Sequence, residues 1–313
     1  MLDIKEFFKN CKDLLEIKWL LNEKTCNSKI AVSSRESADL IGHLNLIHPY
    51  RIQVFGKQEV EYFGGLEKSR RNYLLGELFS ALPPAILIAE NQPPPQEILE
   101  ACKEKNVPLL TTKNMAAVAI ELLRVQISKK LAPRESRHGV FMDVLGIGVL
   151  ISGESGLGKS ELGLELLTRG HGLVADDVVD LVRIPGNVVE GRAPDLLRNL
   201  IEVRGLGLLD IKTIFGETSV RRKLRLRIIV QLVKRSVINE YDRLPLEALY
   251  EDILGLKIKK VVIPVSAGRN LAVLVEAAVR NTVLQLRGID TMKEFMIRQK
   301  KAMDHSITDE KKA

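Results

Sequence analysis

The chain has 313 residues and a formal net charge of +7, with 45% hydrophobic and 28% charged residues. This balance is ordinary for a folded globular protein and excludes a disordered chain. No apolar stretch approaches the ~18 residues of a membrane span, and the acidic start does not resemble a signal peptide, so we expect a cytoplasmic protein without membrane contacts. The charge suits an anionic partner but is too mild, without aromatic-studded basic segments, to indicate nucleic-acid binding.

The first part of the chain predicts a small α/β domain. At ~150 residues per domain, the length predicts two domains. Asp3 and Glu6 resemble a capping box that starts a helix. Short strands, each followed by a helical pattern, are expected at residues 51–55, 85–89 and 107–110. Such alternation favours a mainly parallel sheet, and we assign residues 1–128 to this structural or regulatory domain. Cys11, Cys26 and Cys102 lack metal-ligand spacing and are expected to be reduced packing residues.

The remainder of the chain predicts a linker, a second domain and a tail. Proline and mixed charge interrupt both periodicities in residues 129–137, which we expect to be the linker. The second domain then covers residues 138–302, and residues 303–313 are expected to form a flexible tail. Within that domain, residues 223–229 alternate basic and apolar side chains. This pattern favours the guarded edge of a sheet over a surface for an acidic partner.

The most informative segment of the second domain fits the pattern G-x-x-x-x-G-K-[ST]. An apolar strand is expected before it at residues 146–152 and a leucine-patterned helix after it, which is the setting of a phosphate-binding loop. Its glycines permit a tight turn, so backbone N–H groups and the start of the helix can face a phosphate chain. Lys159 is expected on the β- and γ-phosphates and Ser160 on magnesium. The predicted nucleotide-binding residues are Gly153, Glu154, Ser155, Gly156, Leu157, Gly158, Lys159 and Ser160.

Two adjacent carboxylates, Asp176 and Asp177, follow a short strand expected at residues 173–175. An open α/β sheet presents its ligand-binding groups at this end of its strands. Adjacent side chains point in different directions, so one carboxylate can face magnesium while the other accepts the proton of an attacking hydroxyl. An isolated Asp-Asp pair is more often a solvated turn, but a position one helix after a phosphate loop favours the chemical role.

Two further blocks carry charged side chains beside glycine-rich turns. In residues 201–210 a strand places Glu202 and Arg204 on one face, which supplies a metal ligand next to a phosphate-pairing guanidinium. Alone, this pattern is more often an exposed strand and turn. Farther along, a strand at residues 261–265 leads to Arg269 and a helix start, where a second anion could bind. A plain strand-to-helix connection is the equal alternative there.

In combination, these blocks resemble the bacterial HPr kinase/phosphorylase family. The resemblance is carried by His138 and by GESGLGKS, VADD, IEVRGLGLLD, YDRL and IPVSAGRN in the second domain, and by RIQVFG and VPLLTT in the first. It implies a C-terminal P-loop kinase domain of the PEP carboxykinase-like type. It also implies a bifunctional enzyme that uses magnesium and ATP, or pyrophosphate, to phosphorylate a serine of the phosphocarrier protein HPr. The family removes that phosphate by phosphorolysis with inorganic phosphate, which yields pyrophosphate, and forms hexamers that act in carbon catabolite regulation.

The resemblance also implies roles for single residues. His138, Lys159, Asp177 and Arg243 match catalytic positions, with Asp177 as proton acceptor during phosphorylation and proton donor in reverse. The implied metal-binding residues are Ser160, Glu202 and Asp176. The motif used in both directions consists of Ile201, Glu202, Val203, Arg204, Gly205, Leu206, Gly207, Leu208, Leu209 and Asp210. The dephosphorylation loop consists of Pro264, Val265, Ser266, Ala267, Gly268 and Arg269.

The sequence leaves other functions to be weighed. At Ala267 the chain departs from the family, where proline is common, and a looser loop would position the second anion of phosphorolysis less well. A nucleotide-gated GTPase or ATPase switch shares the phosphate loop, but the chain has no N-K-x-D segment for reading guanine. A kinase with a small-molecule acceptor is excluded less firmly. The helix expected at residues 291–300 either docks on a partner or packs into the core.

Overall fold

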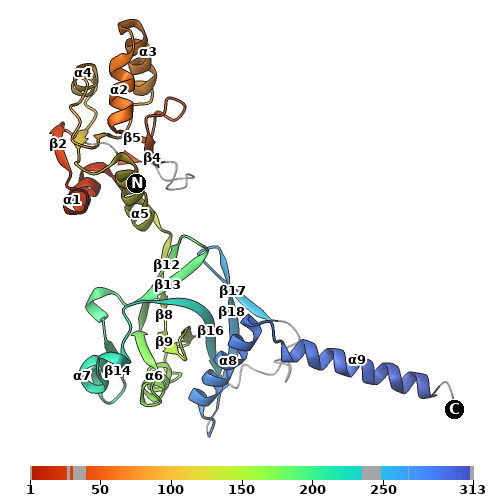
Figure 1. The fold of residues 1–313 in the computed structure, drawn as a ribbon. Helices are drawn as coiled ribbons and strands as arrows, with labels where there is room; N and C mark the ends of the chain where they lie inside the picture. Colours follow the sequence, from red (N-terminus) through yellow and green to blue (C-terminus); the bar gives the residue numbers. More distant parts are fainter. Residues whose placement is uncertain (1, 27–28, 31–39, 235–247, 267, 311–313) are drawn as a thin grey trace. The chain divides into compact units, whose positions relative to one another are not determined.

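The computed structural model describes residues 2–26, 29–30, 40–234, 248–266 and 268–310. The chain divides into two compact units, Met1–Ala132 and Pro133–Ala313 (Figure 1). Helix α5 (Ala116–Leu131) and strand β8 (Arg134–His138) occupy most of the segment expected to be a linker. Backbone pairing of β8 with a neighbouring strand outweighs the loop-like composition of its residues. Helix α9 (Thr291–Glu310) likewise extends through most of the expected tail.

The N-terminal unit is built on a five-stranded sheet. Its strands are β2 (Lys18–Leu21), β4 (Ile41–His43), β5 (Ile52–Phe55), β6 (Ile86–Ile88) and β7 (Leu109–Thr111), and a separate ladder joins β1 (Leu2–Asp3) to β3 (Lys29–Ile30). The order in the sheet is β2-β7-β6-β5-β4. All neighbouring pairs are parallel except β2 with β7, which confirms the mainly parallel sheet. Every residue of β5 and β6 is buried, as expected for strands with both faces covered.

Helices cover both faces of this sheet. One core contains side chains of α1 (Ile4–Leu15) and α5, and the other contains side chains of α2 (Lys57–Gly65), α3 (Lys68–Phe79) and α4 (Gln96–Glu104). Helix α1 starts as predicted, because the Asp3 carboxylate accepts the backbone N–H of Glu6 at 2.9 Å. The three cysteines are buried and unpaired. Burial raises the pKa of Cys11 to about 11 and that of Cys102 to about 12, as suits packing residues.

The C-terminal unit is built on a nine-stranded sheet. Its strands are β8, β9 (Val140–Val144), β10 (Ile147–Gly153), β11 (Gly172–Ala175), β12 (Val178–Ile184), β13 (Val188–Arg192), β16 (Leu224–Lys234), β17 (Leu249–Ile253) and β18 (Leu256–Val265). The order is β11-β9-β10-β16-β13-β12-β8, with β18 beside β16 and β17 beside β18. Strands β10, β16 and β18 are parallel, whereas the other pairs are antiparallel. The parallel trio carries the predicted phosphate loop at the end of β10.

Strand β16 shows that the edge predicted for residues 223–229 is wrong. It pairs with β10 along most of its length, with β13 at its start and with β18 from Ile228 onward. Its backbone is therefore engaged on both sides, and its basic side chains guard no edge. An edge strand and a central strand with one partly uncovered face can both alternate basic and apolar residues. The pattern alone therefore does not distinguish an edge position from a central one.

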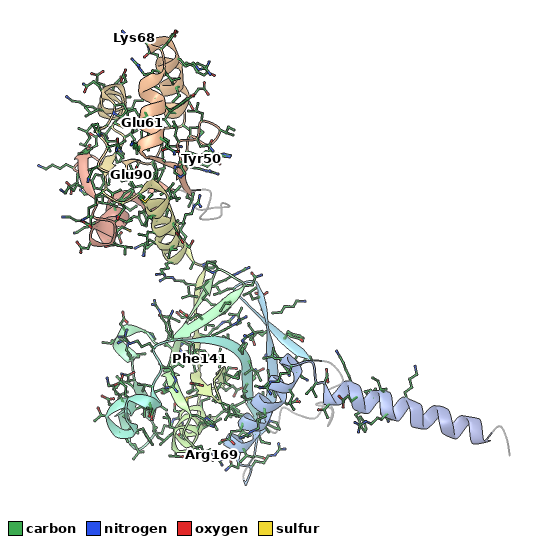
Figure 2. The ribbon with its side chains drawn as sticks, viewed as in Figure 1. Tyr50, Glu61, Lys68, Glu90, Phe141 and Arg169 are labelled. Atoms are coloured by element: carbon green, nitrogen blue, oxygen red, sulfur yellow. The ribbon has the colours of Figure 1, made fainter. Side chains whose placement is uncertain are left out.

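Two hydrophobic cores lie within the C-terminal unit. Helices α6 (Lys159–Thr168) and α8 (Leu271–Leu286) contribute to the first, together with the hairpin of β14 (Leu200–Val203) and β15 (Gly207–Asp210). Phe141 on β9 is fully buried in the second (Figure 2). Gly191 on β13 packs directly against it, since an added Cβ would lie 2.5 Å from the Phe141 ring. In the parts of the chain that the structure describes, no helix is long and apolar enough to span a membrane.

Candidate active site

The predicted phosphate loop joins β10 to α6. Strand β10 ends at Gly153 and α6 begins at Lys159. Gly156 and Gly158 between them have φ angles of 82° and 78°, a region that side chains rarely adopt, so glycine permits this turn. Gly158 caps α6 without a side-chain hydrogen bond. The first N–H groups of the helix are therefore left open toward an anion, as the sequence pattern predicts.

Lys159 is held inside the loop by the backbone of the loop itself. Its Nζ donates to the carbonyl oxygen of Gly153 at 3.0 Å and to that of Glu154 at 2.9 Å. The carboxylate of Glu154 in turn contacts Lys234 at the end of β16 at 2.6 Å. That hydrogen bond and the charge of Lys234 hold the pKa of Glu154 below its usual value. The Glu154–Lys234 contact thus ties the loop to β16, while Lys159 stays within the turn of the loop.

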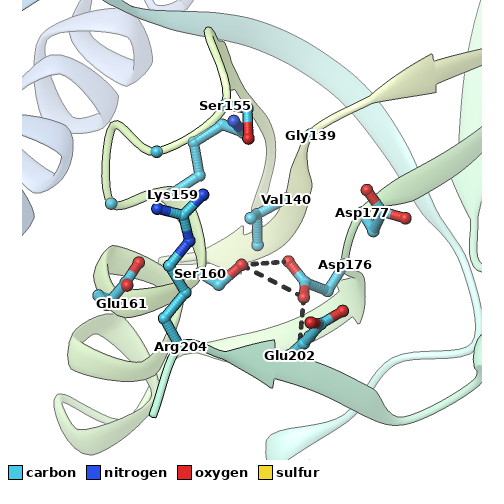
Figure 3. A pocket seen from close by; sticks show the side chains of 12 residues that line it. Gly139, Val140, Ser155, Lys159, Ser160, Glu161, Asp176, Asp177, Glu202 and Arg204 are labelled. Atoms are coloured by element: carbon cyan, nitrogen blue, oxygen red, sulfur yellow. Dashed lines mark hydrogen bonds between the residues drawn. The ribbon is translucent and has the colours of Figure 1, made fainter. Parts of the chain in front are cut away.

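Asp176 links the loop helix to the β14–β15 hairpin. Its side chain is buried, and its carboxylate accepts the Ser160 hydroxyl at 3.1 Å and the backbone N–H of Glu202 at 2.9 Å (Figure 3). Burial raises the pKa of Asp176, while the bonds from Glu202 and Ser160 oppose that rise and the nearby charge of Asp177 adds to it. The structure therefore brings together the three residues expected to bind a metal.

Asp177 faces away from Asp176, toward His138. Its side chain is 69% exposed, and its Oδ1 lies 3.6 Å from Nδ1 of His138, whose side chain is 84% exposed. Figure 3 shows the two carboxylates pointing in different directions, as the sequence analysis expects. The backbone fixes this pair: His138 on β8 pairs with Val178 on β12, and Gly139 donates its N–H to the carbonyl oxygen of Asp177 at 3.0 Å.

The β14–β15 hairpin alternates between the core and the site. Ile201 and Val203 are buried in the first core, whereas Glu202 and Arg204 are exposed and line a pocket. This matches the expected division of the strand into two faces. Asp210, at the end of the same motif, does not line the pocket. Its carboxylate instead accepts a backbone N–H at the start of helix α7 (Ile211–Phe215), so its role there is structural.

These groups surround a pocket of about 260 Å³. It is lined by Gly139, Val140, Ser155, Gly156, Gly158, Lys159, Ser160, Glu161, Asp176, Asp177, Glu202 and Arg204. The guanidinium of Arg204 reaches the loop, since its Nη1 lies 3.4 Å from where a Cβ on Gly156 would stand. Sequence reasoning missed Gly139, Val140 and Glu161. The position of Glu161 directly after the loop serine was the one available signal.

Some predicted residues are not brought to this pocket. Arg243 and Ala267 lie outside the described residues. Pro264 and Val265 form the end of β18, and Arg269 follows it; none of the described residues of the expected dephosphorylation loop lines the pocket. The backbone N–H of Arg269 donates to the carbonyl oxygen of Ser266 at 3.3 Å, which closes a local turn. The structure thus gathers the phosphate loop, both aspartates and the hairpin, with His138 beside them.

The donor atoms around Asp176 fit magnesium. Ser160, Asp176 and Glu202 supply hydroxyl and carboxylate oxygens, which hard cations prefer, and no sulfur or imidazole. Within the described ranges, no three His, Cys, Asp or Glu side chains gather closely enough to hold a metal by themselves. Magnesium commonly takes only one or two carboxylates and completes its shell with waters and substrate phosphates. The set therefore suits an ion that binds together with a polyphosphate.

Comparisons with known proteins agree with this arrangement. The family model described as HPr Serine kinase C-terminal domain matches residues 129–299, and that described as HPr Serine kinase N terminus matches residues 2–125. A protein of Bordetella pertussis named HPr kinase/phosphorylase is 55% identical over 303 residues, which cover 97% of this chain and 98% of that protein. One of the same name from Paraburkholderia xenovorans is 57% identical over 293 residues, covering 92% and 91%.

A solved structure is similar over part of the chain. The HPr(Ser) kinase/phosphatase from Coxiella burnetii is 37% identical, with a TM-score of 0.46, and the match covers 51% of this chain and 98% of that one. The two family models leave few residues of the chain unmatched, and the curated relatives match it almost from end to end. Both domains are matched, and the chain therefore belongs to the HPr kinase/phosphorylase family.

Proposed function

We propose that this protein transfers a phosphoryl group from ATP, or from pyrophosphate, to a serine of HPr, and that it also removes that group with inorganic phosphate. The names of its relatives support the kinase and phosphorylase activities and the acceptor. The pocket supports the donor, because a glycine-turned loop, an open helix start and two cations match the charge of a polyphosphate. Magnesium, held by Ser160, Asp176 and Glu202, would neutralise charge on the donor's phosphates.

In the forward direction, the protein orients the donor and removes a proton from the acceptor. Lys159 and the first N–H groups of α6 hold the β- and γ-phosphates, and Arg204 pairs with their oxygens. Asp177 accepts the proton of the serine hydroxyl as that oxygen attacks the γ-phosphorus. The bond from the γ-phosphorus to the bridging oxygen breaks, and ADP leaves. His138, close to Asp177, stabilises the transferred group when protonated. The resemblance assigns a similar role to Arg243.

In the reverse direction, the same carboxyl group donates the proton. An oxygen of inorganic phosphate attacks the phosphorus of phosphoserine, and the bond from that phosphorus to the serine oxygen breaks. Asp177 returns a proton to the serine oxygen, and pyrophosphate leaves. The loop that held the β- and γ-phosphates of ATP then holds the two phosphates of the product, which explains how one site serves both reactions.

One observation carries the proposal, namely the division of work between the two adjacent aspartates. Asp176 is buried and committed to Ser160 and Glu202, so it is unavailable to an incoming hydroxyl. Asp177 is exposed at the rim of the same pocket, and among the described residues His138 is the one basic side chain within ion-pair distance of its carboxylate. A general base must be reachable by the proton that it removes, and Asp177 meets this condition.

The product that carries the label from γ-labelled ATP tests the proposal. The protein is incubated with magnesium, labelled ATP and purified HPr, and acid-stable phosphoserine on HPr is expected. Free phosphate without labelled HPr would instead support a nucleotide-gated switch, and a labelled small molecule would support a metabolite kinase. A second arm adds inorganic phosphate to phosphorylated HPr and measures pyrophosphate. Release of the label as free phosphate alone would contradict phosphorolysis.

The proposal extends to the setting of the enzyme. A hexamer and a role in carbon catabolite regulation follow from the family resemblance and are supported by the match to both family models. Light scattering of the purified protein gives its mass in solution and tests the hexamer directly, since six chains of 35.0 kDa differ clearly from one or two.

A further inference from the structure

A salt bridge joins the phosphate loop to the end of β16. The carboxylate of Glu154 lies 2.6 Å from Nζ of Lys234, and the side chains of Glu154 and Lys234 are 65% and 55% exposed. Neither of these two residues lines the loop pocket. An ion pair this exposed contributes little to stability, because water screens it and two long side chains must be ordered to form it. Its place beside the loop therefore points to a role in ligand binding rather than in holding the fold.

The strand register places Lys234 beside the loop. Strand β10 ends where Gly153 pairs with Leu232, while β16 continues for two more residues beside β18. Side chains alternate along a strand, so Lys234 lies on the same face as Leu232, which is buried in the first core together with side chains of α6. Gly153 packs on this part of β16, since an added Cβ would stand 2.6 Å from the carbonyl oxygen of Leu232. The end of β16 thus lies directly against the start of the loop.

Two lysines bond to Glu154 at the same time. Its backbone carbonyl oxygen accepts a hydrogen bond from Nζ of Lys159 at 2.9 Å, and its carboxylate contacts Lys234. The hydrogen bond from Lys234 and the charge of that lysine lower the pKa of Glu154, so the carboxylate is ionised at neutral pH. The loop consequently carries a negative charge of its own, one residue before Ser155 in the wall of the pocket.

The charges that line the loop pocket make a further carboxylate unfavourable. Among its described lining residues, two are basic and four are acidic, namely Lys159, Arg204, Glu161, Asp176, Asp177 and Glu202. A polyphosphate therefore enters a site in which fixed negative charges outnumber fixed positive ones, and magnesium would offset part of this excess. An unpaired carboxylate at Glu154 would add to the repulsion of the phosphates. A paired one repels them much less, because the charge of Lys234 cancels most of its field.

We propose that Lys234 is a positioning residue that acts through Glu154: it neutralises this carboxylate and thereby sets the affinity of the loop for the phosphoryl donor. This inference rests on the function proposed above. If the pair served only to hold the loop in place, loss of either side chain would weaken donor binding. If Lys234 acts by its charge, the two losses have opposite effects. Removing Lys234 leaves a negative charge beside the loop, whereas removing the charge of Glu154 leaves a positive one.

Calorimetry of the full-length protein with magnesium and the ATP analogue AMP-PNP separates these two cases. Lys234→Met should weaken binding by about three- to tenfold at low salt, and Glu154→Gln should strengthen it by a similar factor. The double variant should bind as the unchanged protein does, because the net charge beside the loop is the same in both. Lys234→Arg keeps the charge and should retain the affinity. The effect of Lys234→Met should shrink as sodium chloride is raised from about 0.05 to about 0.5 M, since salt screens exposed charges.

The matched control is Lys223→Met. Lys223 directly precedes β16, at the opposite end of the strand from Lys234, and forms an ion pair with Glu190 at 2.9 Å. Its removal lowers the net charge of the protein by the same amount and should leave the affinity for AMP-PNP unchanged. Weaker binding in both single variants, or an unchanged affinity in Lys234→Met, would overturn the role of Lys234 alone. Absence of AMP-PNP binding by the unchanged protein would overturn the proposed function as well.

Discussion

At the scale of single residues, the site depends on what each charged group is already bonded to. Asp176 and Asp177 are adjacent, yet one is enclosed by Ser160 and Glu202 and the other is open to solvent. Lys159 and Arg204 both face the loop, but only Lys159 is held by backbone carbonyl oxygens of that loop. These differences in hydrogen bonding assign separate tasks to groups of the same chemical type.

Lys159→Ala is expected to abolish phosphoryl transfer in both directions. The phosphates need this cation whichever way the group moves, so we expect the rates to fall by roughly 10²-fold or more. Rates of HPr phosphorylation and of pyrophosphate release measure the effect. Lys212→Ala, which removes an exposed lysine from α7 outside the pocket, is the control and should leave both rates unchanged. Normal turnover in Lys159→Ala would remove the loop from the mechanism.

Asp177→Asn is expected to retain nucleotide binding and to lose transfer. The amide keeps the size of the side chain but cannot accept the serine proton, a loss of roughly 10²–10⁴-fold in rate. Calorimetry with a nucleotide analogue and the HPr phosphorylation rate separate the two effects. Asp176→Asn serves as the comparison. If that substitution spares magnesium-dependent binding and is more damaging to transfer, the roles of the two aspartates are reversed.

Asp176→Asn is also expected to show that the site is not built for maximal stability. Because burial raises the pKa of Asp176 in the folded state, the folded protein binds more protons than the unfolded chain between the two pKa values. Its ionisation therefore lowers stability as the pH rises through that window, and the cost persists at higher pH. The variant should melt at an unchanged or higher temperature at pH 7. A clear fall in melting temperature would show that the bonds from Ser160 and Glu202 dominate.

The sequence predicted part of this residue-scale arrangement. The loop, the aspartate pair and Glu202 could be placed because each follows a strand end or alternates along a strand. The bond from the Glu202 backbone to Asp176 could not, since it joins groups 26 residues apart that only the folded chain brings together. The same holds for Glu161, whose place in the pocket depends on the direction of α6.

At the scale of elements, local pattern predicted which segments are strands but not which strands are central. The strands near residues 51–55, 85–89 and 107–110 lie close to where they were expected, because each is a short apolar run between turn residues. Strand β16 was placed at an edge, although it pairs with three strands. The strands that pair with its backbone come from distant parts of the chain, and they cannot be predicted from the side-chain pattern of β16 alone.

The register of β10 against β16 shifts next to Gly148, and the close approach of the two strands there makes Gly148 sensitive to substitution. A Cβ at Gly148 would overlap the carbonyl oxygen of Arg225 and lie 3.0 Å from the ring of Phe141. Gly148→Ala is therefore expected to cost about 1–3 kcal/mol of stability. Gly76→Ala, in open space within α3, should instead stabilise the N-terminal unit by about 0.5–1 kcal/mol. Hydrogen exchange of peptides from each unit measures both changes, and equal effects at the two positions would contradict the steric explanation.

At the scale of the whole molecule, the chain forms two units, each with its own hydrophobic cores. Length and alternating strands and helices predicted two α/β domains, and the chain divides between Ala132 and Pro133, inside the segment 129–137 that was expected to be the linker, although β8 occupies part of that segment. That strand has a polar composition, and its backbone pairs with β12, a partner that its own sequence does not indicate. Every described residue that lines the loop pocket belongs to the unit Pro133–Ala313.

A fragment that begins at Pro133 is therefore expected to bind nucleotide as tightly as the full chain. It contains its own two hydrophobic cores and all of the pocket. Calorimetry with a nucleotide analogue compares the two proteins, and circular dichroism establishes that the fragment is folded. A folded fragment with much weaker binding would show that residues 1–132 contribute to the site.

The bonds from Lys159 to the carbonyl oxygens of Gly153 and Glu154 have a consequence for selectivity. Because the ammonium already donates two hydrogen bonds to backbone carbonyl oxygens, a neutral metabolite or a singly charged ion gives it little additional stabilisation. We expect only a polyphosphate, with several negatively charged oxygens close together, to compete with these hydrogen bonds for the ammonium. The loop is therefore expected to select ligands first by the density of their negative charge and only then by their shape.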